Sequence, residues 1–321
     1  MKNISFIIGI EKNDDIQLEQ MAILLCRSIR KFGGIYKDAP IYSLQPTSRD
    51  IDASTLVELK KLGVIHRKEV INTEFTKGGY GFYNMPYVCD YFAQTLKEDY
   101  LIWLDIDVLC LNSPIFKVNT DDVVCDTYDK AIMGKGYADY VAIDESSFIL
   151  TNFKKFGFSA PKKICCTWFQ MLGKQNFYLW SEWRKKFESI MLTFRDEGID
   201  TTSSDMCCVE ELSYSMVLEE NGINPVKVND AHPHLGSFTG LTLPFDKNTM
   251  FFHYDGFRGT GEGNPPVDNL GYDGSEEYFH LIFTRDIERK KKLWVYINIQ
   301  EIGVHRNKSQ LDAYMSSIIK N

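Results

Sequence analysis

The 321-residue sequence predicts an α/β protein with a mostly parallel central sheet and helices on both of its faces. Three observations predict this fold class. Apolar segments of strand length alternate with helical patterns over the first 110 residues. The segment 100–104 is almost wholly apolar, which is typical of a strand that is buried on both sides of a sheet. Hydrophobic residues make up 44% and charged residues 25%, so the chain can bury a core.

Boundary residues separate the expected elements of the first third of the chain. Gly33 and Gly34 end the first helix, Gly63 ends the second, and Asn84 with Pro86 begins the third. We therefore expect strands at residues 4–10, 39–44, 64–66 and 100–104, and helices at residues 18–32, 54–62 and from 84 onward.

The remainder of the chain is less regular. A helix at residues 178–194 carries an aromatic and aliphatic stripe, which predicts a face buried in the core rather than a functional aromatic box. A glycine-rich stretch at 256–275 predicts a long loop. The other expected elements are a helix at 210–220, strands at 225–228 and 249–252, and one or two helices at the C-terminal end, with Ser309 as an N-cap.

Charge and cysteine content exclude several classes of function. The formal net charge of −8 argues against binding to duplex DNA or to an anionic membrane, because both need positive surface. The sequence contains no apolar stretch long enough for a membrane span, and its first apolar run is too short for a secretory signal. Eight cysteines without a CxxC motif predict reduced structural thiols. We therefore expect a soluble, cytoplasmic protein.

Two carboxylates end the apolar segment 100–104. Asp105 and Asp107 are spaced i, i+2, so they share one side of an extended chain, and the carboxyl end of a strand in an open α/β sheet is where ligands bind. His253 follows another apolar strand and is the expected third ligand. Two carboxylates and an imidazole suit Mn²⁺, with Mg²⁺ as the second choice. Gly256 permits close backbone approach, and Arg258 offers a guanidinium fork for diphosphate oxygens.

The pattern of Asp105-x-Asp107 after a strand, with a late His253-x-x-Gly256, resembles the nucleotide-sugar glycosyltransferases of GT-A fold. Within that fold it is most similar to the retaining group that includes glycogenin-like and bacterial galactosyltransferase-like enzymes. The resemblance covers most of residues 1–258. It implies a metal-dependent enzyme that transfers a hexosyl or pentosyl group from a nucleoside diphosphate, with UDP favoured.

The resemblance also implies roles for individual residues. Contacts to the donor are expected from the end of the first strand, from the stretch before the DxD strand and from the later sugar segment, namely from Gly9, Ile10, Lys77, Asn84, Asp105, Gln170, Gly256 and Arg258. The oxocarbenium-like sugar centre needs a carboxylate or amide nearby. The expected catalytic residues are Glu211 first, then Glu210 and Asp205; each is equally well explained as an acid favoured at a helix start.

The resemblance predicts one catalytic domain at residues 1–280 and a helical extension at 281–321. Residues 1–110 would form the nucleotide-binding half and residues 111–280 the half for the sugar and the acceptor, a glycan, glycolipid or other hydroxyl compound. A basic cluster at 285–292 is either a solvated face or a contact to an anionic acceptor. The identity of the sugar, the retaining or inverting course and the oligomeric state stay open.

Two other functions compete with the transferase. A haloacid-dehalogenase-like phosphohydrolase also begins from a strand that ends in Asp-x-Asp, but that motif normally lies near the N-terminus and here about a hundred residues precede it. A non-catalytic sugar-nucleotide-binding protein is the third interpretation. It is favoured by Gln170, which stands where the family usually has Asn, and by Gly259, which stands where the family commonly has Lys.

Overall fold

The structure is a computed structural model of the whole chain. It describes residues 3–11, 17–73, 75, 81–106, 108–110, 113–114, 119–129, 148–201, 209–227, 235–237 and 251–253. The chain forms two compact units. Unit 1 comprises Met1–Glu19, Ala39–Ile106 and Phe116–His232, and unit 2 comprises Gln20–Asp38, Asp107–Ile115 and Pro233–Asn321.

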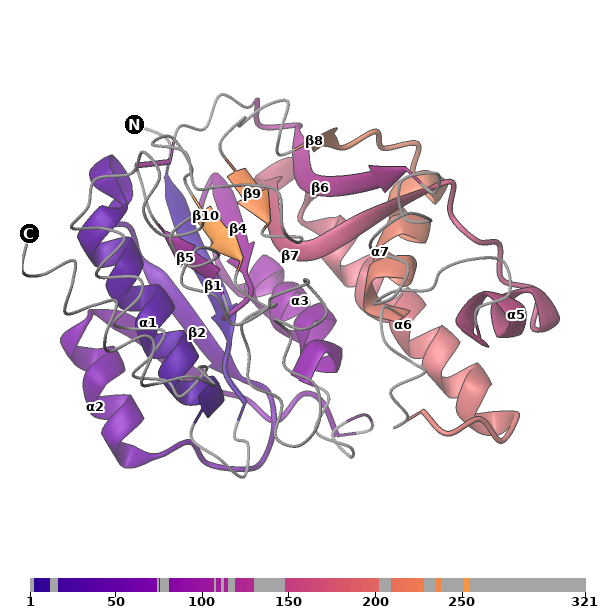
Figure 1. Cartoon of the computed structure of the whole chain (residues 1–321), viewed down its shortest axis with the longest axis horizontal. Coiled ribbons are helices and arrows are strands. Elements are labelled where there is room, and N and C mark those ends of the chain that lie inside the picture. Colours follow the sequence, from indigo (N-terminus) through magenta and orange to yellow (C-terminus); the bar gives the residue numbers. More distant parts are fainter. Residues whose placement is uncertain are drawn as a thin grey trace, which may run out of the picture. The chain divides into compact units, whose positions relative to one another are not determined.

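Unit 1 is built on a seven-stranded mixed sheet with the strand order β3-β2-β1-β4-β7-β6-β8 (Figure 1). The first four strands in this order are parallel to one another, and β7 runs antiparallel to both of its neighbours. The strands are β1 (Ile4–Gly9), β2 (Ile41–Gln45), β3 (Val64–Lys68), β4 (Tyr100–Leu104), β6 (Val123–Asp129), β7 (Lys163–Gly173) and β8 (Val226–Lys227).

Strands β1 and β4 form the centre of this sheet, because the side chains of β4 are apolar on both faces and those of β1 are apolar apart from Ser5. All five residues of β4 and the first five of β1 are buried. Parallel pairing in which Phe6 lies opposite Ile102 and Ile7 opposite Trp103 fixes the register. The predicted central strand at 100–104 is therefore confirmed, and its carboxyl end lies beside that of β1.

Three helices cover one face of the unit 1 sheet: α3 (Met85–Thr95), α6 (Tyr178–Asp196) and α7 (Val209–Glu220). Their apolar side chains form one core with the sheet residues that point to that face, including Ile7, Leu101 and Trp103. Helices α3 and α6 run side by side (Figure 1). Helix α2 (Ala53–Lys61) packs near the edge strand β3, and α5 (Phe148–Lys155) contributes to a second apolar cluster.

The aromatic stripe of α6 is part of the core, as predicted. Trp180, Trp183, Phe187, Ile190 and Phe194 are all fully buried. The first two join the cluster against the sheet, and the other three join the second cluster with α5. The stripe serves packing throughout its length.

Unit 2 contains a three-stranded sheet with the order β5-β10-β9 and helix α1 (Gln17–Phe32) from Gln20 onward. Its strands are β5 (Val108–Cys110), β9 (Leu235–Ser237) and β10 (Phe251–His253). Ser28 joins α1 to β5, because its hydroxyl accepts the backbone N–H of Cys110 at 2.9 Å. Helix α1 ends before Gly33 and Gly34, as predicted, and Gly34 adopts the left-handed backbone that favours glycine, with φ 57°.

Several expectations are confirmed by the described residues and others lie outside them. The expected α/β fold class with a mostly parallel sheet is present, and six of the cysteines are free and buried. None of the described helices is long and apolar enough to cross a membrane. The expected loop at 256–275 and the helical extension at 281–321 fall outside the described residues.

Candidate functional site

The strand order of unit 1 changes direction at β1. From β1 the chain proceeds to β2 on one side, and it later returns to place β4 on the other side. In open α/β sheets, ligands bind in the crevice outside the carboxyl ends of the strands at such a switch point. Here Ile10 and Glu11 follow β1, and Asp105 follows β4. The predicted donor-contact residues Gly9, Ile10 and Asp105 thus lie at this edge of the sheet.

Asp105 is held in place through both its backbone and its side chain. Its backbone N–H donates to the carbonyl of Trp168 in β7 at 2.9 Å, and its Oδ1 accepts the indole N–H of Trp103 at 3.0 Å. The residue is only 8% exposed. A carboxylate buried to this extent needs hydrogen-bond donors, and Trp103 supplies one of them.

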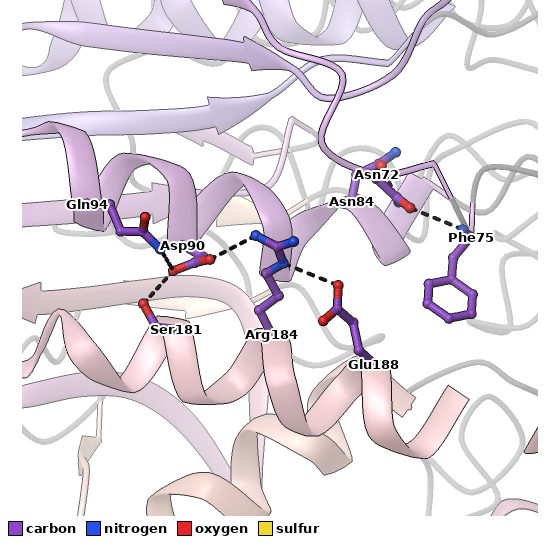
Figure 2. Close-up of polar contacts among 8 residues, drawn as sticks. All are labelled: Asn72, Phe75, Asn84, Asp90, Gln94, Ser181, Arg184 and Glu188. Atoms are coloured by element: carbon purple, nitrogen blue, oxygen red, sulfur yellow. Dashed lines mark hydrogen bonds and ion pairs between the residues drawn. The ribbon is translucent and has the colours of Figure 1, made fainter. Parts of the chain in front are cut away.

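Asn84 is part of a chain of hydrogen bonds beside the end of β1. Its Nδ2 donates to Glu11 Oε2, and its Oδ1 accepts from Asn72 Nδ2, both at 2.7 Å. Asn72 in turn accepts the backbone N–H of Phe75 at 3.1 Å, as Figure 2 shows. Asn84 precedes α3 as predicted, but it makes no side-chain cap bond to that helix. Its amide orientation is fixed by this chain instead.

Glu11, at the same edge of the sheet, has a perturbed carboxyl. Burial raises the pKa of its carboxyl above the ordinary 4.5, and the hydrogen bond from Asn84 and the charge of Arg49 offset only part of that increase. A carboxyl with a raised pKa at a switch point is a candidate ligand contact. Sequence reasoning did not single out Glu11, although its position directly after an apolar strand is a signal that could have found it.

The predicted catalytic acids Glu210 and Glu211 lie in the first turn of α7, where the positive end of the helix dipole favours them. Glu211 Oε1 accepts the backbone N–H of Thr167 at 3.3 Å. Thr167 precedes Trp168, whose carbonyl binds Asp105, so Glu211 and Asp105 bind adjacent residues of β7. Glu210 is 3% exposed, and its carbonyl accepts the Trp183 indole N–H at 2.9 Å.

Gln170, predicted to lie at the sugar, is fully buried in β7 opposite Trp103. Its Oε1 accepts the indole N–H of Trp180 at 2.7 Å, so the side chain is engaged with α6. Its register partner Trp103 lies inside β4, whereas Asp105 lies just beyond the end of that strand. A donor contact by Gln170 stays a prediction.

In unit 2 the late strand β10 pairs antiparallel with β5, and His253 stands in register with Val108. Val108 is the residue that follows Asp107 in the chain. No group of three acidic, histidine or cysteine side chains in the described part of the chain converges in metal-binding geometry. Asp107 and the side chain of His253 lie outside the described residues, as do Lys77, Asp205, Gly256 and Arg258.

The comparison with protein-family models gives no match, and neither does the comparison with curated proteins.

Proposed function

We propose that this protein is a metal-dependent glycosyltransferase of GT-A type. It transfers a sugar from a nucleoside diphosphate donor, UDP being favoured, to a hydroxyl group of a glycan or glycoconjugate. Asp105, Asp107 and His253 bind Mn²⁺, or Mg²⁺ in its place. The residues at the carboxyl ends of β1 and β4 contact the nucleotide.

One observation carries the proposal: His253, far along the chain, pairs in register with Val108, the residue after Asp107. Directly opposed residues of antiparallel strands have Cα atoms only about 5 Å apart. A histidine some 145 residues later in the sequence thus has its backbone next to the segment that follows the Asp-x-Asp motif. Sequence spacing alone cannot bring the two together, so this register supports the predicted pairing of an imidazole with the carboxylates.

The chemical character of the proposed ligands fits the metal. Carboxylate oxygens and a neutral imidazole form a mixed set that Mn²⁺ accepts. Asp105 is ordered by Trp103 and Trp168, as a metal ligand needs to be. When bound, the cation would stabilise the negative charge that develops on the leaving nucleoside diphosphate.

The remaining roles belong to side chains of the chain itself. Arg258 would bind the diphosphate oxygens through its guanidinium fork. Glu211 would face the anomeric centre and stabilise its positive charge, with Glu210 and Asp205 as the other candidates. The backbone N–H of Thr167 donates to Glu211 Oε1 and helps to orient this carboxylate.

A thermal-shift screen tests the class of protein. A ligand that binds only the native state must raise the unfolding temperature, so UDP together with Mn²⁺ should stabilise the protein more than either alone. The same protein should hydrolyse a UDP-sugar slowly in the absence of acceptor. Release of phosphate from p-nitrophenyl phosphate, without any response to UDP and Mn²⁺, would instead indicate a phosphohydrolase.

Two substitutions test the proposed metal ligands. Asp107→Ala and His253→Ala should each abolish Mn²⁺-dependent donor turnover while the protein still unfolds cooperatively. Asp121→Ala removes an exposed carboxylate of the loop before β6 and is the matched control, with unchanged turnover expected. Full activity in either ligand variant would remove that residue from the metal site.

A further inference from the structure

The indole of Trp103 contacts a predicted metal ligand from inside the core of unit 1. Trp103 and Asp105 are spaced i, i+2, so their side chains share one face at the end of β4. The bond from Trp103 Nε1 to Asp105 Oδ1 is 3.0 Å long. A carboxylate has about four acceptor sites, so one indole N–H can orient the group while the group accepts other partners as well.

The indole ring itself has little freedom to move. Trp103 is 4% exposed and belongs to the core formed with α3 and α6. Gly9 in the neighbouring strand makes room for it: a Cβ at this position would lie 3.2 Å from Trp103 Cη2 and 3.4 Å from Val88 Cγ2. The ring therefore holds its N–H in one place, between the glycine of β1 and the side chains of the core.

We infer that Trp103 is a positioning residue that orients the Asp105 carboxylate for Mn²⁺, and that Gly9 leaves the space in which the indole sits. The inference rests on the proposed function, because it assumes that Asp105 binds the metal. Groups that hydrogen-bond to metal ligands fix the ligand orientation, and removing one lowers metal affinity by about 10- to 100-fold.

The experiment measures Mn²⁺ binding by the full chain without nucleotide, from the electron paramagnetic resonance signal of free Mn²⁺. Trp103→Phe keeps an aromatic ring in the core but deletes the N–H donor. It should weaken Mn²⁺ binding by about 10-fold or more, while thermal unfolding stays cooperative. Gly9→Ala keeps the indole but displaces it, and it should weaken Mn²⁺ binding in the same direction by a smaller factor.

Trp180→Phe is the matched control. It deletes another buried indole N–H of the same core, one that donates to Gln170 Oε1 at 2.7 Å rather than to Asp105. Its Mn²⁺ affinity should equal that of the wild type, although it loses a comparable core hydrogen bond. A general loosening of the core would weaken Mn²⁺ binding in all three variants to the same extent and would overturn the positioning role.

The outcomes separate this inference from the proposed function. If the wild type binds Mn²⁺ and Trp103→Phe binds it with the same affinity, Trp103 has no positioning role and the metal site remains. Absence of Mn²⁺ binding by the wild type, with and without UDP, overturns the proposed function and the inference together.

Discussion

Two hydrogen-bonded networks of unit 1 involve the region of α3, one around the buried Asp90 and one around the half-buried Glu11. Figure 2 shows the first network and the Asn72–Asn84 part of the second. The two networks treat a carboxylate in opposite ways. Along the helix, Asp90 accepts from Arg184 Nη1 at 3.1 Å, from Gln94 at 2.7 Å and from Ser181. Next to its N-terminal end, Glu11 accepts from the neutral amide of Asn84. The first network pairs a negative with a positive charge, and the second relies mainly on amides.

The charge-paired network around Asp90 stabilises the fold, whereas the network around Glu11 suits a ligand site. Burial by itself lowers the pKa of the Arg184 guanidinium, but Glu188 and Asp90 outweigh burial and raise it overall, so the charged pair is favoured. The Arg184 side chain also lies over the Tyr87 ring, 4.7 Å from its centroid. At Glu11 burial raises the pKa, so the charged form is held at a cost. Such an energetically costly group is typical of a ligand site.

The largest effect is expected from breaking the charged network. Asp90→Ala removes three hydrogen bonds and leaves Arg184 with Glu188 as its remaining charged partner among the described residues. Breaking a buried pair from one side costs about 3 kcal/mol of unfolding free energy, here at the low end because the Arg184 side chain is 31% exposed. Denaturant unfolding measures this loss.

Glu188→Ala is the control for that prediction. It removes the second partner of Arg184, an i,i+4 pair at 3.3 Å in which both side chains are 31% exposed. Such a pair is worth only about 0.5 kcal/mol. Equal losses for Asp90→Ala and Glu188→Ala would show that burial does not distinguish the two partners.

A smaller loss is expected from the amide network. Asn84→Ala removes the donor to Glu11 and the acceptor for Asn72, and the free energy of unfolding should fall by about 2 kcal/mol. Asn221→Ala is the matched control, because its amide also donates to a carboxylate, that of Glu182 at 2.7 Å, but at the surface. The control should change the unfolding free energy by less than about 0.5 kcal/mol.

The smallest effect is expected from Glu11→Gln, and it depends on pH. The folded pKa of Glu11 is raised, so the folded state binds more protons than the unfolded state at pH values just above 4.5. The unfolding free energy contributed by Glu11 therefore falls as pH rises through that window.

In Glu11→Gln, the glutamine would keep an acceptor for Asn84 and would lack this titration. The variant should gain stability over the wild type as pH increases from 4.5 toward neutral, as measured by urea unfolding at several pH values. A stability difference that is the same at every pH would contradict the raised pKa.

The parallel part of the sheet could be predicted from the sequence, whereas the antiparallel part could not. Strands β1 to β4 lie in short apolar segments separated by helical patterns and glycines, and all four were expected. Strand β7 was not expected, although it is the longest of the described strands. Its residues Ile164–Gly173 are all buried, so both faces of the strand are covered. The sequence therefore lacks the alternation of apolar and polar residues that marks a strand with one exposed face. Strand β6 and helix α5 were missed as well.

At the candidate site, the sequence determined which residues carry charge and where strands end. Asp105 at the end of β4 and the acids at the start of α7 follow from the apolar segment and the helical pattern that precede or contain them. The sequence did not indicate Glu11, Asn72 or Trp103. The part of each in the candidate site depends on burial or on partners that are far away in the chain.

Local patterns in the sequence determined the strands and helices of the first third of the chain and the positions of the candidate acids, since periodicity and side-chain identity act within a few residues. Only the tertiary structure decided the partners: Asn84 with Glu11, Glu211 with Thr167, and His253 in register with Val108. Strand order and register bring together residues separated by dozens of positions, and they result from the packing of both faces of a sheet rather than from any single segment.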